Sequence, residues 1–209
     1  FRGIPERSDH GCVLTIGNFD GVHRGHQTLL AKLTAKAQAT GLPSAVLTFE
    51  PHPREYFAHE NRPIRLTSLR EKIQRIADQG VDRLYIGRFN TRFAALTAEQ
   101  FIEDILIRGL CARQLMIGDD FRFGKGRRGD FAMLQAAGSE AGFTVEAMHT
   151  LVHEGERVSS SAVREALADG DMPHAARLLG RPYSISGRVM HGDKIGRTIG
   201  FPTANIQLK

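Results

Sequence analysis

The chain has 209 residues, of which 41% are hydrophobic and 24% are charged, as expected of a folded protein with one substantial core. The formal net charge of +5 suits anionic partners, without choosing between nucleic acid and phosphorylated small molecules. No apolar run approaches the roughly 20 residues of a membrane span, and no signal-peptide pattern opens the chain, so we expect no membrane partner.

Apolar runs typical of strands alternate along the chain with segments of helical spacing. The expected strands are residues 12–17, 44–49, 82–87, 113–118 and 143–149. The expected helices are residues 26–41, 67–80, 97–109, 130–142, 160–170 and 172–180. A capping-box pattern, Thr97 with Gln100, opens the third helix, and Phe101 is expected to pack inward. The alternation predicts an α/β fold with a parallel sheet and helices on both faces.

The character of the sequence changes at about Pro182. Residues 183–209 contain many glycines and show no helical period, which is typical of β-rich structure. We therefore predict a first domain at 1–182 and, at 183–209, the incomplete opening of a second domain.

Two cysteines, Cys12 and Cys111, lie on apolar strand-like segments. Isolated cysteines of this kind favour reduced core thiols in a cytoplasmic protein over a disulfide or a metal site.

The segment GNFDGVHRGH (17–26) directly follows the first strand and precedes the first helix. Its glycines allow a tight turn, and a helix start there offers unpaired N–H groups, a natural seat for phosphate. His23 and His26 are spaced to reach one side of the turn and to donate to phosphate oxygens. Two alternatives remain open from spacing alone: metal ligation by the histidines, or a plain glycine turn with solvated histidines.

A second glycine-rich stretch, GKGRRG (124–129), matches the dinucleotide pattern G-x-G-x-x-G. It does not follow its strand directly, and arginines fill its variable places. We interpret it as a mobile glycine and arginine loop near the substrates rather than as an NAD site.

The HxGH core at residues 23–26 resembles the signature of the nucleotidyltransferase superfamily, and the longer GNFDGVHRGH resembles bacterial FAD synthetase, the bifunctional riboflavin kinase/FMN adenylyltransferase family. Six further blocks resemble that family in the correct order: TFEPHPRE (48–55), FAALTAEQFI (93–102), IGDDFRFGKGRRGDF (117–131), RVSSSAVREAL (157–167), LGRPYSISGRV (179–189) and GRTIGFPTANI (196–206). The resemblance implies a Rossmann-like nucleotidyltransferase domain followed by the start of a β-barrel riboflavin kinase domain.

The activity implied by the resemblance is transfer of AMP from ATP to FMN, giving FAD and pyrophosphate. The FMN phosphate is itself a nucleophile, so no covalent enzyme intermediate is needed, and the enzyme has to align two anions and neutralise charge. Mg²⁺ is the expected cofactor. The full-length family member also phosphorylates riboflavin, but the catalytic carboxylate of the kinase is expected beyond Lys209.

The site residues are carried over position by position. The expected catalytic residues are His23, His26, Ser160 and Arg164. The expected ATP contacts are Gly17, Asn18, Phe19, Asp20, Gly25, Ser159 and Ser161. The expected flavin contacts are Pro51, His52, Pro53, Phe57 and Phe123, with Phe121 as an alternative stacking ring. Asp120 is the expected magnesium or substrate contact, and Thr203 and Asn205 the expected kinase contacts to nucleotide phosphate and Mg²⁺.

Simpler structural explanations exist for several of these residues. Asp20 could be a cap or a turn-former, and the serines could be an ordinary helix cap followed by a surface arginine at Arg164. Each aromatic residue taken singly could be core packing. Ser161 stands where the family usually has threonine, which keeps the hydroxyl.

Two other functions compete with FMN adenylylation. The first is nucleotide transfer to a different phosphate acceptor, as in other members of the superfamily. The segments FEPHP and GFPTAN argue against this alternative, because they resemble the FAD synthetase family. A basic nucleic-acid-binding module would use the arginine-rich loop at 122–129, and its binding would fall steeply with salt. The oligomeric state is not predicted.

Overall fold

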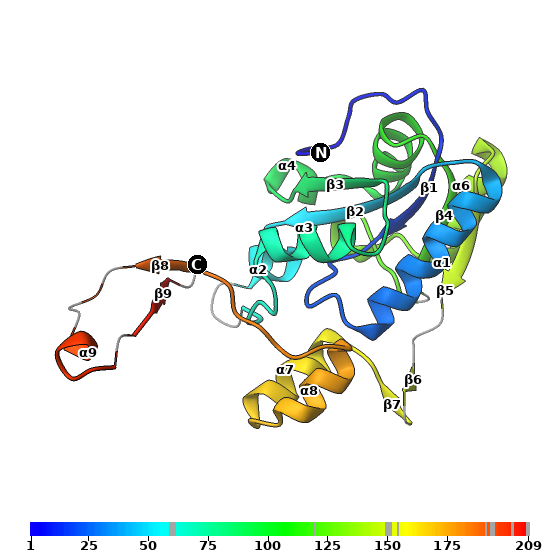
Figure 1. Ribbon diagram of the computed structural model, residues 1–209. Helices are drawn as coiled ribbons and strands as arrows, with labels where there is room; N and C mark the ends of the chain where they lie inside the picture. The colour runs from blue at the N-terminus through cyan, green and yellow to red at the C-terminus, as the bar shows by residue number, and fades with distance from the viewer. Residues whose placement is uncertain are drawn as a thin grey trace.

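The structure, a computed structural model, describes residues 1–58, 62–118, 120–148, 152–153, 155–190, 192, 195–201 and 203–207. Its centre is a sheet of five strands in the order β3-β2-β1-β4-β5, and every neighbouring pair is parallel (Figure 1). The strands are β1 (Cys12–Ile16), β2 (Ser44–Glu50), β3 (Arg83–Arg88), β4 (Ala112–Gly118) and β5 (Thr144–Met148). The predicted parallel α/β fold is confirmed.

Helices cover both faces of this sheet. The helices are α1 (Arg24–Thr40), α3 (Leu69–Ala77), α5 (Ala98–Gln100), η1 (Phe101–Gly109) and α6 (Phe131–Ala141). On one face, Val13 and Val46 of the strands join Leu30 and Leu33 of α1 in a common core. On the other face, a second core joins the alternate strand residues to Phe101 and Leu106 of η1 and to Leu134 of α6. Successive strand residues thus point to opposite, buried faces, which explains the continuous apolar runs.

The helix predicted at residues 97–109 begins with the expected capping box, in which Thr97 and Gln100 each bond the other's backbone N–H. From Phe101 onward it is π-helical, and the Leu110 N–H reaches back to the carbonyl of Ile105, at 2.8 Å. The wider turn places Phe101 and Leu106, five residues apart, in the same core.

Short elements connect the main ones: α2 (Pro53–Phe57), α4 (Thr91–Ala94), η2 (Lys125–Arg127), β6 (Val152–His153) and β7 (Glu156–Arg157). The GKGRRG stretch contains η2 and forms a tight turn, closed by paired backbone hydrogen bonds between Phe123 and Gly129.

Helices α7 (Ser160–Ala168) and α8 (Met172–Leu179) lie side by side beyond the sheet (Figure 1). Their buried residues, among them Val163 and Leu179, form a third small core with Leu66, which precedes α3. This packing brings residues near 160 and 180 up to the segment before α3.

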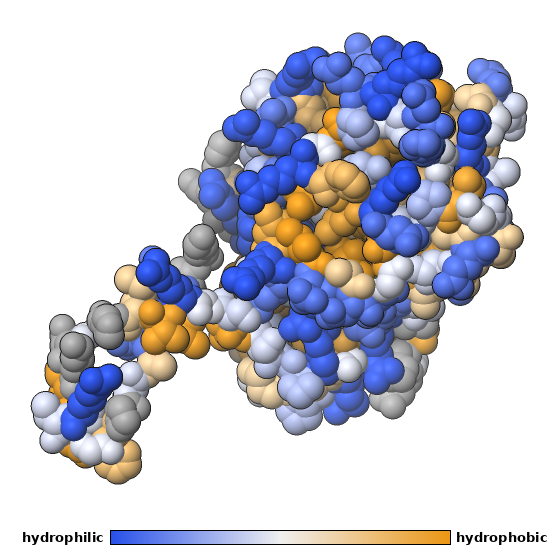
Figure 2. All heavy atoms as spheres, turned by 45° about the horizontal axis from the view of Figure 1, so that its top comes forward, coloured by the Kyte–Doolittle hydropathy of each residue, from blue (hydrophilic) through white to orange (hydrophobic). Residues whose placement is uncertain are grey.

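After α8 the chain runs past α3, where Arg75 donates to the hydroxyl of Ser184. It then extends away from the α/β body, as Figure 1 shows, and forms β8 (Arg188–Met190), α9 (Ile195–Thr198) and β9 (Asn205–Gln207). Strands β8 and β9 pair antiparallel, and the one-turn helix α9 was not expected from the pattern. In Figure 2 this extension carries apolar side chains on its surface, and the division of the chain near residue 182 stays a prediction.

Within the part of the chain that the structure describes, no helix is both long enough and apolar enough to cross a bilayer. Cys12 and Cys111 are free thiols, but the prediction that both are core thiols on strands holds only for Cys12, because Cys111 is half-buried in the turn before β4, with φ of +49°. Cys12 is buried on β1 and its thiol donates to the carbonyl of Leu110.

Candidate active site

Three of the predicted site segments follow strands β1, β2 and β4 at the same edge of the sheet. They are residues 17–23, 51–53 and 120–124. From β1 the chain adds β2 and β3 toward one edge of the sheet, and it then adds β4 and β5 on the opposite side of β1. The direction of winding therefore reverses between β1 and β4. Open parallel sheets bind ligands at such a switch point, beyond the carboxyl ends of the strands.

The loop between β1 and α1 turns through three left-handed residues, Phe19, Gly21 and Val22, with φ angles of +49°, +81° and +40°. Phe19 and Val22 are buried and anchor the loop in the core below α1. A side chain at Gly21 would meet Leu66 at 2.9 Å, so both the backbone angle and the packing require glycine there. At Gly17 an added carbon would instead press on the Phe19 ring, at 3.0 Å.

Side-chain donors from α1, α7 and the segment after α8 hold the carbonyl groups of this loop. The Ser160 hydroxyl donates to the Asp20 carbonyl at 2.9 Å. The Gln27 amide donates to the Val22 carbonyl at 2.8 Å, and the Arg181 guanidinium donates to the Gly21 and Val22 carbonyls. Gln27 and Arg181 were not predicted as site residues. Because these acceptors are occupied, fewer of the loop's oxygens remain to repel an anion.

His23 and His26 stand at the first turn of α1. His23 is the N-cap, and its Nδ1 accepts from the His26 N–H at 3.4 Å. The two imidazole rings stack with centroids 3.7 Å apart. Burial lowers the pKa of His23 to about 4 and holds the pKa of His26 well below its ordinary value, so both rings are neutral near pH 7. A neutral imidazole offers one N–H donor, the kind of group a phosphate oxygen accepts from.

Gly25 lies between the two histidines. An added carbon there would lie 3.2 Å from the His23 ring, so glycine leaves this face of the helix start open. The unpaired N–H groups of a helix's first turn, together with its dipole, attract anions. The helix begins at Arg24, two residues before the predicted start at His26.

Asp20 connects the β1–α1 loop to two other segments. It is buried, and its carboxylate accepts from the N–H groups of Leu66 and Thr67 at 3.1 Å and from the Thr67 hydroxyl. Arg164 of α7 donates to the same carboxylate at 2.5 Å. Its oxygens are therefore used within the protein, which gives Asp20 a structural task whether or not it also meets a substrate.

The serines at the start of α7 divide their roles. Ser159 is the N-cap and accepts from the Ala162 N–H at 3.1 Å. Ser160 points to the β1–α1 loop, as described above, while Ser161 is exposed. Arg164 is not a plain surface arginine, because besides Asp20 it donates to the Ile64 carbonyl at 2.6 Å. The structure thus brings together the two predicted phosphate motifs, 140 residues apart in the chain.

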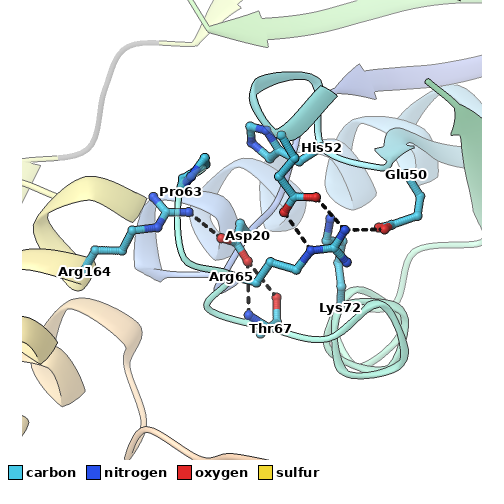
Figure 3. A pocket seen from close by; sticks show the side chains of 9 residues that line it. Asp20, Glu50, His52, Pro63, Arg65, Thr67, Lys72 and Arg164 are labelled. Carbon is cyan, nitrogen blue, oxygen red and sulfur yellow. Dashed lines mark hydrogen bonds and ion pairs between the residues drawn. The ribbon is translucent and has the colours of Figure 1, made fainter. Parts of the chain in front are cut away.

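A pocket lies between this pair and the end of β2. Its lining residues are Asp20, Glu50, His52, Glu55, Pro63, Arg65, Thr67, Lys72 and Arg164 (Figure 3). Arg65 bonds both oxygens of Glu55, at 2.7 and 2.6 Å, and one oxygen of Glu50 at 2.6 Å. Burial alone would raise the pKa of Glu55, but the Arg65 contacts outweigh it and the pKa is lowered. The sequence offered no signal for Arg65 or Lys72, which look like ordinary charged residues before and within a helix.

The FEPHP segment, predicted to meet the flavin, forms the start of α2. His52 is the N-cap of this helix and accepts from the Arg54 N–H at 2.9 Å. Burial, reinforced by the charge of Lys72, lowers the pKa of His52 to about 4. Phe57 at the end of α2 is 64% exposed and contacts Phe89 edge to face, with centroids 5.7 Å apart.

Phe57 begins a continuous row of aromatic rings. The row runs through Tyr56, Phe89, Phe49, Phe93, Phe101 and Phe123 to Phe121, with neighbouring centroids 5.2 to 6.1 Å apart. Phe101 is buried, as predicted. Phe123 is also buried, and the more accessible Phe121 stacks on it at 5.7 Å.

The remaining predicted residues lie apart from the pocket lining. Asp120 is largely exposed and forms an ion pair with Arg157 at 3.2 Å. Among the described residues, no cluster of three or more histidine, cysteine or acidic side chains could hold a metal ion. Thr203 and Asn205 are exposed in the C-terminal extension, where Asn205 pairs with Met190 across β8 and β9.

The parallel sheet, the loop at its switch point and the opposing helix start at Ser160 define the class of Rossmann-like nucleotidyltransferase domains. Comparison with known families is more specific. The family model described as FAD synthetase matches residues 5–162, and the one described as riboflavin kinase matches residues 179–209. The chain belongs to the bifunctional riboflavin kinase/FMN adenylyltransferase family.

Similar proteins agree with this assignment. The bifunctional riboflavin kinase/FMN adenylyltransferase of Escherichia coli (strain K12) is 54% identical over 211 residues, covering 100% of this chain and 67% of the relative. The protein of the same name from Haemophilus influenzae is 54% identical, covering 99% of this chain and 68% of the relative. A crystal structure from Streptococcus pneumoniae, titled a macrolide-efflux protein, matches with a TM-score of 0.84 and 29% identity, covering 99% of this chain and 68% of that one.

Proposed function

We propose that this chain transfers AMP from ATP to FMN, giving FAD and pyrophosphate. The observation that carries the proposal is the pair of contacts from α7 to the β1–α1 loop, Ser160 to the Asp20 carbonyl and Arg164 to the Asp20 carboxylate. They attach the first turn of α7 to the loop that leads into the start of α1. The family assignment supplies the identity of the two substrates.

The chemistry needs no protein nucleophile. An oxygen of the FMN phosphate attacks the α-phosphorus of ATP, the bond from that phosphorus to the bridging oxygen breaks, and pyrophosphate leaves. His23 and His26 would donate from neutral rings to the phosphate oxygens as charge shifts toward the leaving group. Arg164 bonds Asp20 through Nη2 and Ile64 through Nε. No other hydrogen bond of its guanidinium is seen among the described residues, so Nη1 is available to meet the triphosphate.

The other ATP contacts surround this centre. The backbone of Gly17, Asn18 and Phe19 would border the nucleotide. Asp20 would contribute to ATP binding by holding the guanidinium of Arg164 in place. The hydroxyls of Ser159 and Ser161 flank Ser160 at the second helix start, although Ser159 also serves as the cap of α7.

Mg²⁺ would enter with ATP. This ion keeps several waters and is bound by substrate phosphates together with one or two carboxylates, so it needs no cage made wholly of protein. Asp120 offers one carboxylate at the end of β4, but it would have to leave Arg157 to serve. When bound, Mg²⁺ supplies positive charge to the phosphate oxygens.

For the flavin, the edge-to-face rings of Tyr56, Phe57 and Phe89 offer apolar surface at α2, with Pro51, His52 and Pro53 adjoining them in the chain. Phe57 is the exposed ring at one end of the row. At the other end we assign the stacking role to Phe121 rather than to Phe123, because Phe121 covers Phe123.

The full-length protein would also phosphorylate riboflavin to FMN. The match of residues 179–209 to the riboflavin kinase family supports this activity, with Thr203 and Asn205 as the contacts to nucleotide phosphate and Mg²⁺. A cytoplasmic location and the absence of a nucleic-acid partner stay predictions.

Incubation of the chain with FMN, Mg²⁺ and [α-³²P]ATP tests the adenylyl transfer. We expect labelled FAD and unlabelled pyrophosphate. His26→Ala should lower kcat/KM about 100- to 1,000-fold while the circular dichroism spectrum is kept, and His10→Ala, a change of an exposed histidine, should have no effect. Absence of labelled FAD from the unaltered chain would refute the proposal. Labelled product with a different phosphate acceptor only would support the rival within the superfamily.

A further inference from the structure

Lys72 is the buried cation of the pocket that the proposed chemistry has not used. It lies on α3, is only 4% exposed and lines the pocket with Asp20 and His52. Figure 3 shows it rising from the helix toward the centre of the pocket, close to Arg65. Within the described part of the chain, its ammonium group forms no hydrogen bond and no ion pair.

The neighbouring charges do not supply the missing partner. Burial lowers the pKa of Lys72, and Asp20, Glu50 and Glu55 oppose that effect from a distance. Each of these carboxylates already accepts from an arginine, Asp20 from Arg164 and both glutamates from Arg65. With no acceptor among the described residues, the three N–H donors of Lys72 in the pocket lining can bind an anion that enters the pocket.

The position of Lys72 indicates which substrate phosphate it would bind. Helix α3 connects β2 to β3, so Lys72 reaches the pocket from the side of β2, where His52 begins the predicted flavin segment. The ATP phosphates already have the starts of α1 and α7, on the other side. Lys72 lines the same pocket as His52 of the predicted flavin segment and Asp20 of the β1–α1 loop, so it borders both predicted substrate segments.

We propose that the ammonium group of Lys72 binds the phosphate of FMN and holds it beside the α-phosphate of ATP. This inference rests on the proposed function. Two phosphates repel as they approach, and a cation between them reduces that repulsion before the bond forms. The same contact would let the site prefer FMN to riboflavin, which lacks the phosphate.

Calorimetric titration of the 209-residue chain with FMN, riboflavin and ATP tests this assignment. Lys72→Met keeps the length of the side chain and removes its charge, Lys72→Gln is a second variant in case methionine does not fold, and Lys32→Met on the exposed surface of α1 is the control. We expect Lys72→Met to weaken FMN binding about 10- to 100-fold, as for a lost charge-assisted hydrogen bond, with riboflavin and ATP binding unchanged.

The other outcomes overturn the assignment. Unchanged FMN binding would show that Lys72 does not meet the phosphate, and equal weakening of FMN and riboflavin would indicate a structural role. Weakening of ATP alone would place Lys72 on the triphosphate. Failure of the unaltered chain to make FAD is a different result, since it contradicts the proposed function itself.

Discussion

The Asp20–Arg164 ion pair yields a quantitative prediction. Replacing Asp20 by asparagine keeps an acceptor for the N–H groups of Leu66 and Thr67 but removes the charge that Arg164 meets. Breaking a buried pair from one side costs about 3 to 5 kcal/mol of unfolding free energy. The Arg164 side chain is 21% exposed and keeps its bond to Ile64, so we expect the lower end, about 3 kcal/mol.

A double-mutant cycle measures the interaction free energy between Asp20 and Arg164. Urea unfolding at pH 7 would be followed for the unaltered chain, Asp20→Asn, Arg164→Met and the double variant. The double variant should be more stable than the sum of the single losses predicts, by about 1 to 3 kcal/mol, because once the partner is gone no charge remains unpaired. Additivity within about 0.5 kcal/mol would refute the claim that this pair joins the two phosphate motifs.

Three further predictions concern stability and reactivity. The pKa of His23 is 6.5 when unfolded and about 4 when folded, so the unfolded chain takes up the proton first as the pH falls. The stability contribution is therefore present above pH 6.5 and lost toward pH 4. Between pH 7 and 5 the unaltered chain should lose about 2 kcal/mol more than His23→Asn, and equal losses in urea titrations would contradict this. Gly21→Ala should lower the unfolding free energy about 2 kcal/mol more than Gly41→Ala, because both glycines have positive φ but only Gly21 is crowded by neighbouring atoms. Thermal melting of the two variants measures this difference. A smaller loss of stability at Gly21 than at Gly41 would contradict the packing argument. Burial raises the pKa of Cys12 to about 12, so Ellman's reagent should titrate this thiol only after unfolding, and fast reaction in the native state would be inconsistent with its place on β1.

The elements of the fold follow from local patterns in the chain. Apolar runs and helical spacing predicted the five strands and the main helices within a few residues, because each pattern reflects which side chains of one segment face the core. The start of the first helix was predicted at His26, within two residues of its position at Arg24, since the glycine turn before it acts on the local backbone. The π-helical turn after Phe101 was not, because it depends on how that helix meets the sheet.

The arrangement of the site, in contrast, comes from contacts between residues remote in sequence. Asp20 and Arg164 are 144 positions apart, and their pairing arises only when α7 packs against the segment before α3. Arg65 and Lys72 read in the sequence as ordinary charged residues, and the pocket that they line exists only after α3 has packed against the end of β2. Periodicity reports which side of a segment is buried, but a charged side chain acquires its partners, and so its role, from the segments that tertiary packing brings to it.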